Sequence, residues 1–341
     1  MALRVATLNV WALPLGLAPE RESRMQAIGR HLAGDAAEVW ALQEVWTDDA
    51  RRILSQAAAA AGMQVAHGGG GLMVASQLPI ESAAFRSYAL AGIATHVHRG
   101  DYLGGKGFQS LHLRAPAGPV VLVNTHLHAQ YHPDDRDPFL GHRTGQVVEL
   151  AAFLARVPEP LVAAGDFNLR EEQDGYRILT GLTGLADAAV ELDRREPTSS
   201  SGTRIDFVLT RGPRPRRIGV FAERGLLSDH AGVVAELEIA PGKHPSRPDP
   251  GVVAEARALL AAGRADALRR RRLDRASVIA ATAAGAGALA LRHVSRRRFL
   301  LGATATLALP GALLSAVSAE RWVSGEIEAF DRVAALLPAG A

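Results

Sequence analysis

The sequence predicts an α/β sandwich over residues 3–239, on the basis of two observations. Short apolar runs containing β-branched residues recur along this stretch, and many of them are bounded by Gly, Pro or Asn, as strands are. Segments with apolar residues at helical spacing lie between some of these runs. Strands mixed with helices over this length favour layers of helix packed on sheet.

The expected strands begin close to the first residue, without a charged and apolar leader before them, so we expect no N-terminal signal peptide. The helix expected at 142–156 has its apolar residues at i, i+3, i+4 and i+7. The other expected helices are 21–33 and 47–61. The expected strands are 3–10, 39–45, 71–76, 108–114, 119–125, 161–165, 205–210 and 232–239.

The C-terminal third has a different composition. Four prolines between 240 and 251 predict a linker, because proline cannot lie inside a regular element. The uncharged run 299–319 is 21 residues long, and a membrane-spanning helix needs about 20. The predicted parts are a folded domain at 1–239, a Pro-rich linker at 240–251, a basic helix at 252–275, hydrophobic membrane segments at 276–319 and an amphipathic tail at 320–341.

Composition excludes several classes of site and partner. The chain has no cysteine, which excludes disulfides, thiolate nucleophiles and Cys-based zinc sites. Residues 252–298 carry 11 Arg against three acids, whereas residues 1–251 sum to −3. A mildly acidic domain disfavours duplex nucleic acid, which usually binds a basic face. The Arg clusters lie beside apolar segments and favour anionic lipid headgroups as their partner.

Side chains suited to metal binding or acid–base chemistry follow several of the predicted strands. Each of them alone is explained by a turn, a helix cap or a solvated strand end. Their joint occurrence in this order, each at the end of an apolar run, favours an active site. They are Asn9 in T-L-N-V-W, Glu44 in L-Q-E-V-W, His126 in V-N-T-H-L-H, Asp166 and Asn168 in A-A-G-D-F-N, Asp206 in R-I-D-F, and Asp229 and His230 in L-S-D-H.

These residue types suit the hydrolysis of a phosphodiester. Mg²⁺ prefers hard oxygen ligands, and Glu44 offers one at the end of an apolar strand. The amides of Asn9 and Asn168 can hold a ligand or a phosphoryl oxygen without adding negative charge.

Acid–base chemistry at neutral pH points to histidine. The ordinary pKa of a histidine suits His230 as the base that takes a proton from water. A carboxylate should fix its tautomer, and Asp206 or Asp229 could do so. His126 could donate to a non-bridging oxygen on which charge develops.

In order and wording, these motifs resemble the endonuclease/exonuclease/phosphatase superfamily, over about residues 3–239. The resemblance implies a four-layer α/β sandwich, in which two packed mixed β-sheets are flanked by helices. It also implies a metal site at Glu44 and Asn9 with Asp229 nearby, filled by Mg²⁺ or by Mn²⁺ as a substitute.

The same resemblance implies roles for the remaining motif residues. Asp166 and Asn168 would activate and orient the attacking water. His230 would be the catalytic histidine, with Asp206 as its orienting partner, and His126 would stabilise the transition state.

Several segments look specifically like the membrane-anchored neutral sphingomyelinases, namely L-N-V-W-A-L-P, T-H-L-H-A-Q-Y and H-R-T-G-Q-V-V-E-L. In the last segment, Arg143, Gln146 and Glu149 share much of one helix face. The loop G-D-Y-L-G-G-K-G also resembles this branch. Its Asp101 and Lys106 could form an ion pair, or Lys106 could face a substrate phosphate.

The resemblance therefore implies a Mg²⁺-dependent phosphodiesterase that releases the headgroup of a phospholipid or sphingolipid such as sphingomyelin. The alternatives are a nuclease of the same superfamily that cleaves DNA, a phosphoinositide phosphatase, and a non-catalytic membrane scaffold. The scaffold would require a missing metal or base residue, and none is missing.

The expected location is a membrane, with a C-terminal anchor of one or two spans and the catalytic domain on the cytoplasmic side. The segment S-R-R-R-F-L at 295–300 resembles a twin-arginine export signal, but it is better explained as the basic flank of a membrane helix. No obligatory protein partner is expected.

Overall fold

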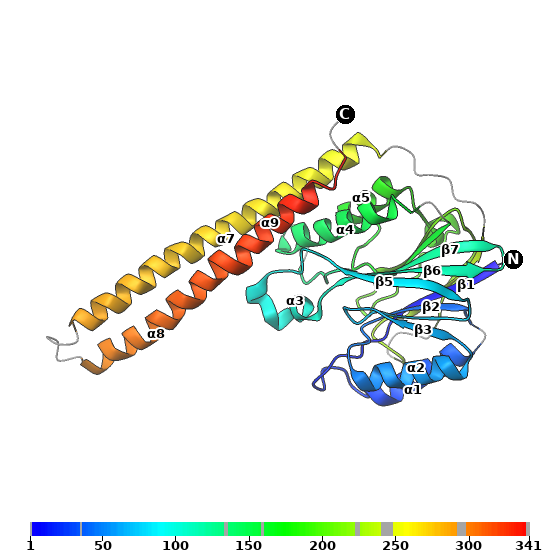
Figure 1. Cartoon of the computed structure of the whole chain (residues 1–341), viewed down its shortest axis with the longest axis horizontal. Coiled ribbons are helices and arrows are strands. Elements are labelled where there is room, and N and C mark those ends of the chain that lie inside the picture. Colours follow the sequence, from blue (N-terminus) through cyan, green and yellow to red (C-terminus); the bar gives the residue numbers. More distant parts are fainter. Residues whose placement is uncertain are drawn as a thin grey trace.

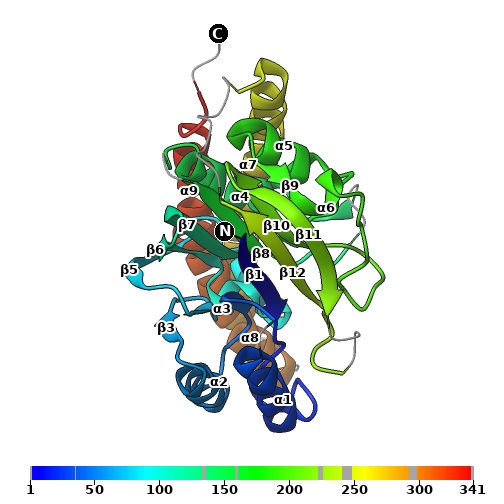
Figure 2. The same cartoon turned by 90° about the vertical axis from the view of Figure 1, so that its right-hand side faces the viewer.

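Two six-stranded β-sheets pack face to face, with helices on their outer faces, in this computed structural model of the chain (Figures 1 and 2). Both sheets are mixed, because each contains one parallel pair among antiparallel ones. The predicted sandwich of two packed mixed sheets flanked by helices is confirmed. The structure describes residues 2–34, 36–132, 136–157, 160–221, 226–239, 248–291 and 298–338, apart from the side chains of 97–99 and 298–305.

The first sheet has the strand order β11-β12-β1-β2-β4-β3. The helices α1 (Arg21–Ala33) and α2 (Asp48–Ala60) pack on its outer face. The strands are β1 (Ala2–Asn9), β2 (Val39–Gln43), β3 (Gln64–His67), β4 (Met73–Ser76), β11 (Arg214–Phe221) and β12 (Gly232–Glu238).

The second sheet has the strand order β5-β6-β7-β8-β10-β9. The helices α4 (Leu140–Leu154) and α5 (Asp174–Thr183) pack on its outer face, and two short helices, α3 (Asp101–Gly104) and α6 (Ala188–Glu191), lie in connections. The strands are β5 (Ile80–Ser87), β6 (Gly107–Ala115), β7 (Gly118–His126), β8 (Leu161–Asp166), β9 (Ala186–Asp187) and β10 (Asp206–Arg211).

Alternation of side chains along the strands separates the apolar core into layers. On β1, Val5 faces the second sheet, whereas Ala6 and Leu8 face α1 and α2. The central strand β8 is buried on both faces over its whole length, which explains its continuous apolar sequence. The sandwich therefore forms a rigid support for the residues that follow its strands.

Three C-terminal helices follow the sandwich: α7 (Pro250–Leu291), α8 (Arg298–Val317) and α9 (Val323–Ala334). The first turns of α7 and the buried face of α9 complete the core outside the second sheet, through Val253, Leu260 and Phe330. Beyond this base, α7 and α8 run side by side and project away from the sandwich as a hairpin (Figure 1). The segments 252–275 and 276–291, which we predicted separately, form one continuous helix.

No helix in the described part of the chain is both long enough and apolar enough to cross a membrane. The structure thus gives no support to a spanning helix at 276–291, where the Ala-rich run shares α7 with Asp274 and Arg275. The predicted span 299–319 begins among residues whose side chains lie outside the described part. Residues 240–247 of the predicted linker and 295–297 of S-R-R-R-F-L also lie outside it.

The polar face of α4 holds neighbouring segments through their main chains. Gln146 donates to Leu90 O at 2.8 Å and accepts from His128 N at 2.8 Å, and Glu149 accepts from Ala89 N at 3.0 and 3.1 Å. Burial raises the pKa of Glu149 to about 7, although these backbone groups and Arg332 act in the opposite direction.

Replacing Glu149 with glutamine should make the free energy of unfolding less dependent on pH. The folded-state pKa of Glu149 lies above its unfolded value, so its protonation stabilises the fold below about pH 4.5, and this stabilisation is lost as the pH rises through about 7. We expect Glu149→Gln to be more stable than the wild type by about 1–2 kcal/mol at pH 8, and nearly equal to it at pH 4.5. Urea unfolding at both values measures the difference, and an equal difference at both would contradict the pKa shift.

Candidate active site

Strand register brings three of the predicted residues side by side at one edge of the second sheet. Asp166 ends β8, and its neighbours across the sheet are His126 at the end of β7 and Asp206 at the start of β10. All three side chains are buried, with at most 2% of each residue exposed. Because β10 runs antiparallel to β8, the first residue of β10, Asp206, lies beside the last residue of β8, Asp166.

Backbone conformation fixes the neighbourhood of Asp166. Gly165 has φ +149°, and a Cβ there would lie 2.1 Å from Thr125 O, so only glycine allows β7 and β8 to approach this closely. Glu44 and Asn168 have φ values of +60° and +47°, in the left-handed region that non-glycine residues rarely adopt. Strain of this kind is common at functional sites.

The two sheets meet at Asn9 and Asp166. Asn9 Nδ2 at the end of β1 donates to Asp166 Oδ2 at 3.0 Å, and Asn9 Oδ1 accepts from Trp11 N at 3.0 Å. Asp166 Oδ1 accepts from Asn168 N at 3.0 Å, and Asn168 Nδ2 donates to Leu127 O at 3.0 Å. Although burial raises the pKa of Asp166, His126 and His230 hold that pKa below its usual range.

His230 and Asp206 form a buried pair. His230 Nδ1 lies 2.8 Å from Asp206 Oδ2, and the other ring nitrogen, Nε2, lies 3.9 Å from Asp166 Oδ2. Burial lowers the pKa of His230, but the Asp206, Asp166 and Asp229 carboxylates outweigh burial and raise the pKa to about 10. From the sequence we expected an ordinary histidine pKa, whereas the three carboxylates that surround the imidazole in the fold raise it.

The residues around Glu44 fit a divalent cation. Burial raises the pKa of Asp229, and the carboxylates of Glu44 and Asp166 raise it further. Carboxylates gathered in this way repel one another unless a positive charge lies between them. Glu44, Asp229 and the Asn9 amide are hard oxygen donors, the type that Mg²⁺ prefers. A cation at Glu44 and Asp229 would also cancel part of the negative field that raises the pKa of His230.

A buried lysine connects the loop before β6 to the same edge. Lys106 Nζ lies 2.7 Å from His126 Nε2 and 2.9 Å from Asp101 Oδ1, so the suggested Asp101–Lys106 ion pair is present. Asp101 also accepts from the Tyr131 hydroxyl. His126 Nε2 lies 3.3 Å from Asp166 Oδ2 and 3.9 Å from Glu44 Oε1. Lys106 thus lies among the predicted residues and is not a surface lysine.

Every residue proposed for the site from the sequence lies at this end of the sandwich, and all of them except Asp229 are linked by the contacts above. Their individual roles in catalysis stay predictions. A group of three that could hold a metal, Asp166, Asp206 and His230, offers ligand atoms that lie within 4.8 Å of one another. Since Asp206 and His230 already share a hydrogen bond, we interpret these two residues as an acid–base pair beside Asp166. The three residues and the family are also compatible with a divalent cation in the site.

Thr198 and Ser228 support the site and were missed from the sequence. Thr198 Oγ1 accepts from Asp206 N at 3.2 Å, and Thr198 O accepts from Ala231 N at 2.7 Å. Ser228 Oγ donates to Asn9 O at 2.6 Å and accepts from His230 N at 3.2 Å. No pattern marks either residue, because P-T-S-S-S and L-S-D both look like ordinary turns.

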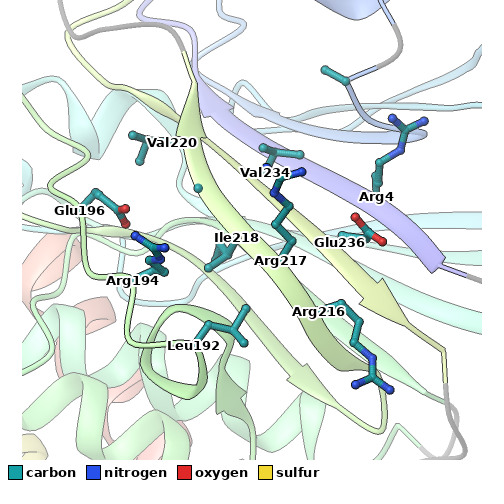
Figure 3. A pocket seen from close by; sticks show the side chains of 12 residues that line it. Arg4, Leu192, Arg194, Glu196, Arg216, Arg217, Ile218, Val220, Val234 and Glu236 are labelled. Carbon is teal, nitrogen blue, oxygen red and sulfur yellow. The ribbon is translucent and has the colours of Figure 1, made fainter.

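A cavity of about 700 Å³ lies away from these residues. It lies along the edge strand β11, with residues of the 192–196 segment on its other side (Figure 3). None of the predicted site residues lines it, so size alone does not locate the chemistry. Its lining is Arg4, Ala36, Leu192, Arg194, Glu196, Arg216, Arg217, Ile218, Gly219, Val220, Val234 and Glu236.

Comparison with known proteins finds relatives among the enzymes that act on sphingolipids. The chain is 32% identical to sphingomyelin phosphodiesterase 2 of Homo sapiens over 56% of this chain and 47% of that one. It is 32% identical to the inositol phosphosphingolipids phospholipase C of Schizosaccharomyces pombe over 54% of this chain and 46% of that one. The chain thus spans about half the length of these curated relatives.

A solved structure with a similar fold is sphingomyelinase C from Streptomyces griseocarneus. Its TM-score is 0.54 at 22% identity, and the match covers 70% of this chain and all of that one. At this identity the likeness supports the fold alone. The model of the Endonuclease/Exonuclease/phosphatase family matches residues 6–230, which include every predicted site residue. The chain belongs to the endonuclease/exonuclease/phosphatase family.

Proposed function

We propose that this protein is a Mg²⁺-dependent phosphodiesterase that hydrolyses the headgroup ester of a membrane sphingolipid, in the manner of a phospholipase C. The observation that carries the proposal is the convergence of Glu44, Asp166 and the His230–Asp206 pair on one buried edge of the sandwich. The names of the relatives at about 30% identity support a sphingolipid as the substrate class.

The arrangement supports a single displacement at phosphorus. Asp166 and Asn168 would orient a water molecule, whose proton passes to Nε2 of His230 as its oxygen attacks phosphorus. The bond between phosphorus and the lipid oxygen breaks, and the lipid alkoxide takes a proton from solvent. With sphingomyelin the products are ceramide and phosphocholine.

Charge that develops on the phosphoryl oxygens has nearby donors. His126 lies next to Asp166, and the Lys106 ammonium lies next to His126. Hydrogen bonds from such groups strengthen as the oxygens gain charge. Glu44, Asn9 and Asp229 would hold the cation. When bound, Mg²⁺ supplies Lewis-acid stabilisation of the phosphoryl group.

We also propose that the protein is associated with a membrane through the α7–α8 hairpin, with the catalytic domain on the cytoplasmic side. Several apolar side chains of the hairpin are exposed, including Ile279 at 71%, Leu307 at 76% and Leu313 at 68%. Such a surface favours contact with lipid. The predicted role of the Arg269–Arg272 cluster in binding anionic lipid is limited, because Arg269 pairs with Asp266 and Arg270 with Glu326.

A substrate panel tests the proposed function. The purified full chain is incubated with Mg²⁺ and labelled sphingomyelin, phosphatidylcholine, a phosphoinositide or plasmid DNA. We expect headgroup release from sphingolipid vesicles, abolished by EDTA and restored by Mg²⁺ or Mn²⁺. Nicking of DNA without lipid turnover would favour a nuclease, and release of inorganic phosphate from the phosphoinositide would favour a phosphatase.

A further inference from the structure

Four exposed leucines of the sandwich lie in the segments that also carry candidate site residues. Leu15 is 93% exposed, Leu17 66%, Leu103 73% and Leu226 67%. In the described part of residues 2–239, the only other exposed large apolar side chain is Val220 on β11, which is 42% exposed. Single exposed leucines need no explanation, but four on the loops of one edge do.

Each of the four leucines lies in a loop or short helix that connects two strands and is close in the chain to a site residue. Leu15 and Leu17 follow Asn9, Leu103 precedes Lys106 and Leu226 precedes Asp229 and His230. These segments connect strand ends at the edge that holds the site, so the leucines lie on the same side of the sandwich as the site. We call this set of four the apolar rim.

The loop that bears Leu15 and Leu17 has a defined conformation. Pro14 O accepts from Leu17 N at 3.2 Å across a tight turn, whose central residues, Leu15 and Gly16, both have positive φ. A leucine in the left-handed region is unfavourable unless the surrounding structure imposes it. The turn therefore holds the Leu15 side chain outward at a conformational cost, which a random surface leucine would not require.

Two arginines of α1 fasten the rim loops to the sandwich. Arg24 is 6% exposed and donates to Trp11 O at 2.9 Å, Val10 O at 3.0 Å and Leu227 O at 3.0 Å, so it ties the loop after β1 to the loop before His230. Arg21 donates to Leu13 O at 2.9 Å. The loop that bears Leu15 and Leu17 and the loop that bears Leu226 are thus held against the sandwich and linked to each other.

Part of the apolar rim lies on the side of the sandwich toward which the helical hairpin projects. Figure 1 shows α3, which bears Leu103, on the side of the sandwich toward which α7 and α8 project. The helix that bears Leu103 and the hairpin, which carries exposed apolar side chains such as Leu307, therefore lie on one side of the sandwich. One planar lipid surface can meet both, whereas a compact protein partner would have to cover two separated sites.

We propose that the rim leucines Leu15, Leu17, Leu103 and Leu226 enter the lipid–water interface and set the active-site entrance against the headgroups. This inference rests on the proposed function and adds how the site reaches a substrate that does not leave the bilayer. The rim contributes to turnover of aggregated lipid and leaves the reaction on a soluble phosphodiester unaffected.

The test compares two substrates with the full chain. The double variant Leu15→Asp/Leu17→Asp should lose at least tenfold in activity on sphingomyelin vesicles and stay within twofold of the wild type on soluble p-nitrophenylphosphocholine. The matched control is Leu336→Asp, a 40% exposed leucine that follows α9, and it should change neither activity. Unchanged vesicle activity, or an equal loss on both substrates, would overturn the proposal.

A second measurement needs no activity and so separates this proposal from the proposed function. Since the chain lacks cysteine, Leu17→Cys and Leu336→Cys each carry a single environment-sensitive fluorophore. On sphingomyelin–phosphatidylcholine vesicles, we expect a blue shift and a rise in emission at position 17 and neither at position 336. If the labelled protein gave this result but did not hydrolyse lipid, the proposed function would be refuted and the proposed role of the rim would stand. If the fluorescence at position 17 did not change, the proposed role of the rim would be refuted.

Discussion

Replacing His230 with glutamine is expected to lower kcat/KM for the lipid phosphodiester by about 10³–10⁴-fold. Glutamine keeps much of the volume but cannot accept and release a proton, so the loss reports on proton transfer. His230 lies 2.8 Å from Asp206 and faces Asp166 with its other nitrogen, a geometry suited to passing a proton from a bound water. Initial rates on vesicles measure the effect, and His112→Gln on the exposed face of β6 is the matched control.

A companion variant checks the electrostatic part of this prediction. Asp206 raises the pKa of His230, so Asp206→Asn should lower that pKa and move the acid limb of the pH–rate profile toward lower pH. A smaller fall in rate than for His230→Gln should accompany the shift. If His230→Gln kept more than a tenth of the activity, another residue would have to be the base.

The second large effect is expected for Glu44→Gln, as a loss of response to the divalent cation. Removing one carboxylate from the group that includes Asp229 weakens cation affinity by at least about tenfold, as changes in metal-binding shells do. We expect activity at low Mg²⁺ to fall by about 10²-fold and to recover partly at high Mg²⁺. Titration of activity with Mg²⁺ and Mn²⁺ measures both effects.

Glu38 provides the matched control for Glu44, because the two glutamates flank the same strand, β2, at its opposite ends. Glu38 accepts from Arg4 N at 2.6 Å and lies far from the site edge along the strand. Glu38→Gln should leave the Mg²⁺ titration unchanged. An identical titration curve for Glu44→Gln and the wild type would show that the cation binds elsewhere.

The central strands could be predicted from the sequence because both of their faces are buried. β8 and β10 are buried at every position, and each contains an apolar run, L-V-A-A in β8 and F-V-L in β10. The edge strands β5 and β11 were missed, because most of their residues are exposed and their sequences carry charge, as in R-P-R-R-I-G-V-F. Exposure on an edge removes the periodicity on which such predictions depend.

The break predicted within the long C-terminal helix has a similar explanation. The composition changes from Arg-rich to Ala-rich near residue 276, and we expected separate segments on either side. This change in composition does not interrupt the helix, because arginine and alanine are both strong helix formers and no proline lies between the two segments. α7 therefore continues through the boundary.

Site residues could be predicted when a side chain suited to metal binding or acid–base chemistry lies at or just after the end of an apolar strand, as Glu44 and Asp166 do. Thr198 and Arg24 could not, because they act by hydrogen bonds to main-chain atoms that are close only in the fold. Arg24 and its acceptor Leu227 O are 203 residues apart. The raised pKa of His230 is likewise a property of the assembled carboxylates and of no single motif.

The way α7 and α9 are built into the protein has a practical consequence for anyone who shortens the gene. Val253, Leu260 and Phe330 close the apolar layer above α4, so a fragment cut at the prolines near 245 would leave that layer open to water. Such a fragment should precipitate or require detergent, even though its metal and histidine residues are intact. A soluble version is better sought by removing the tip of the hairpin and joining α7 to α9, because the base of α7 and all of α9 then still cover the apolar layer.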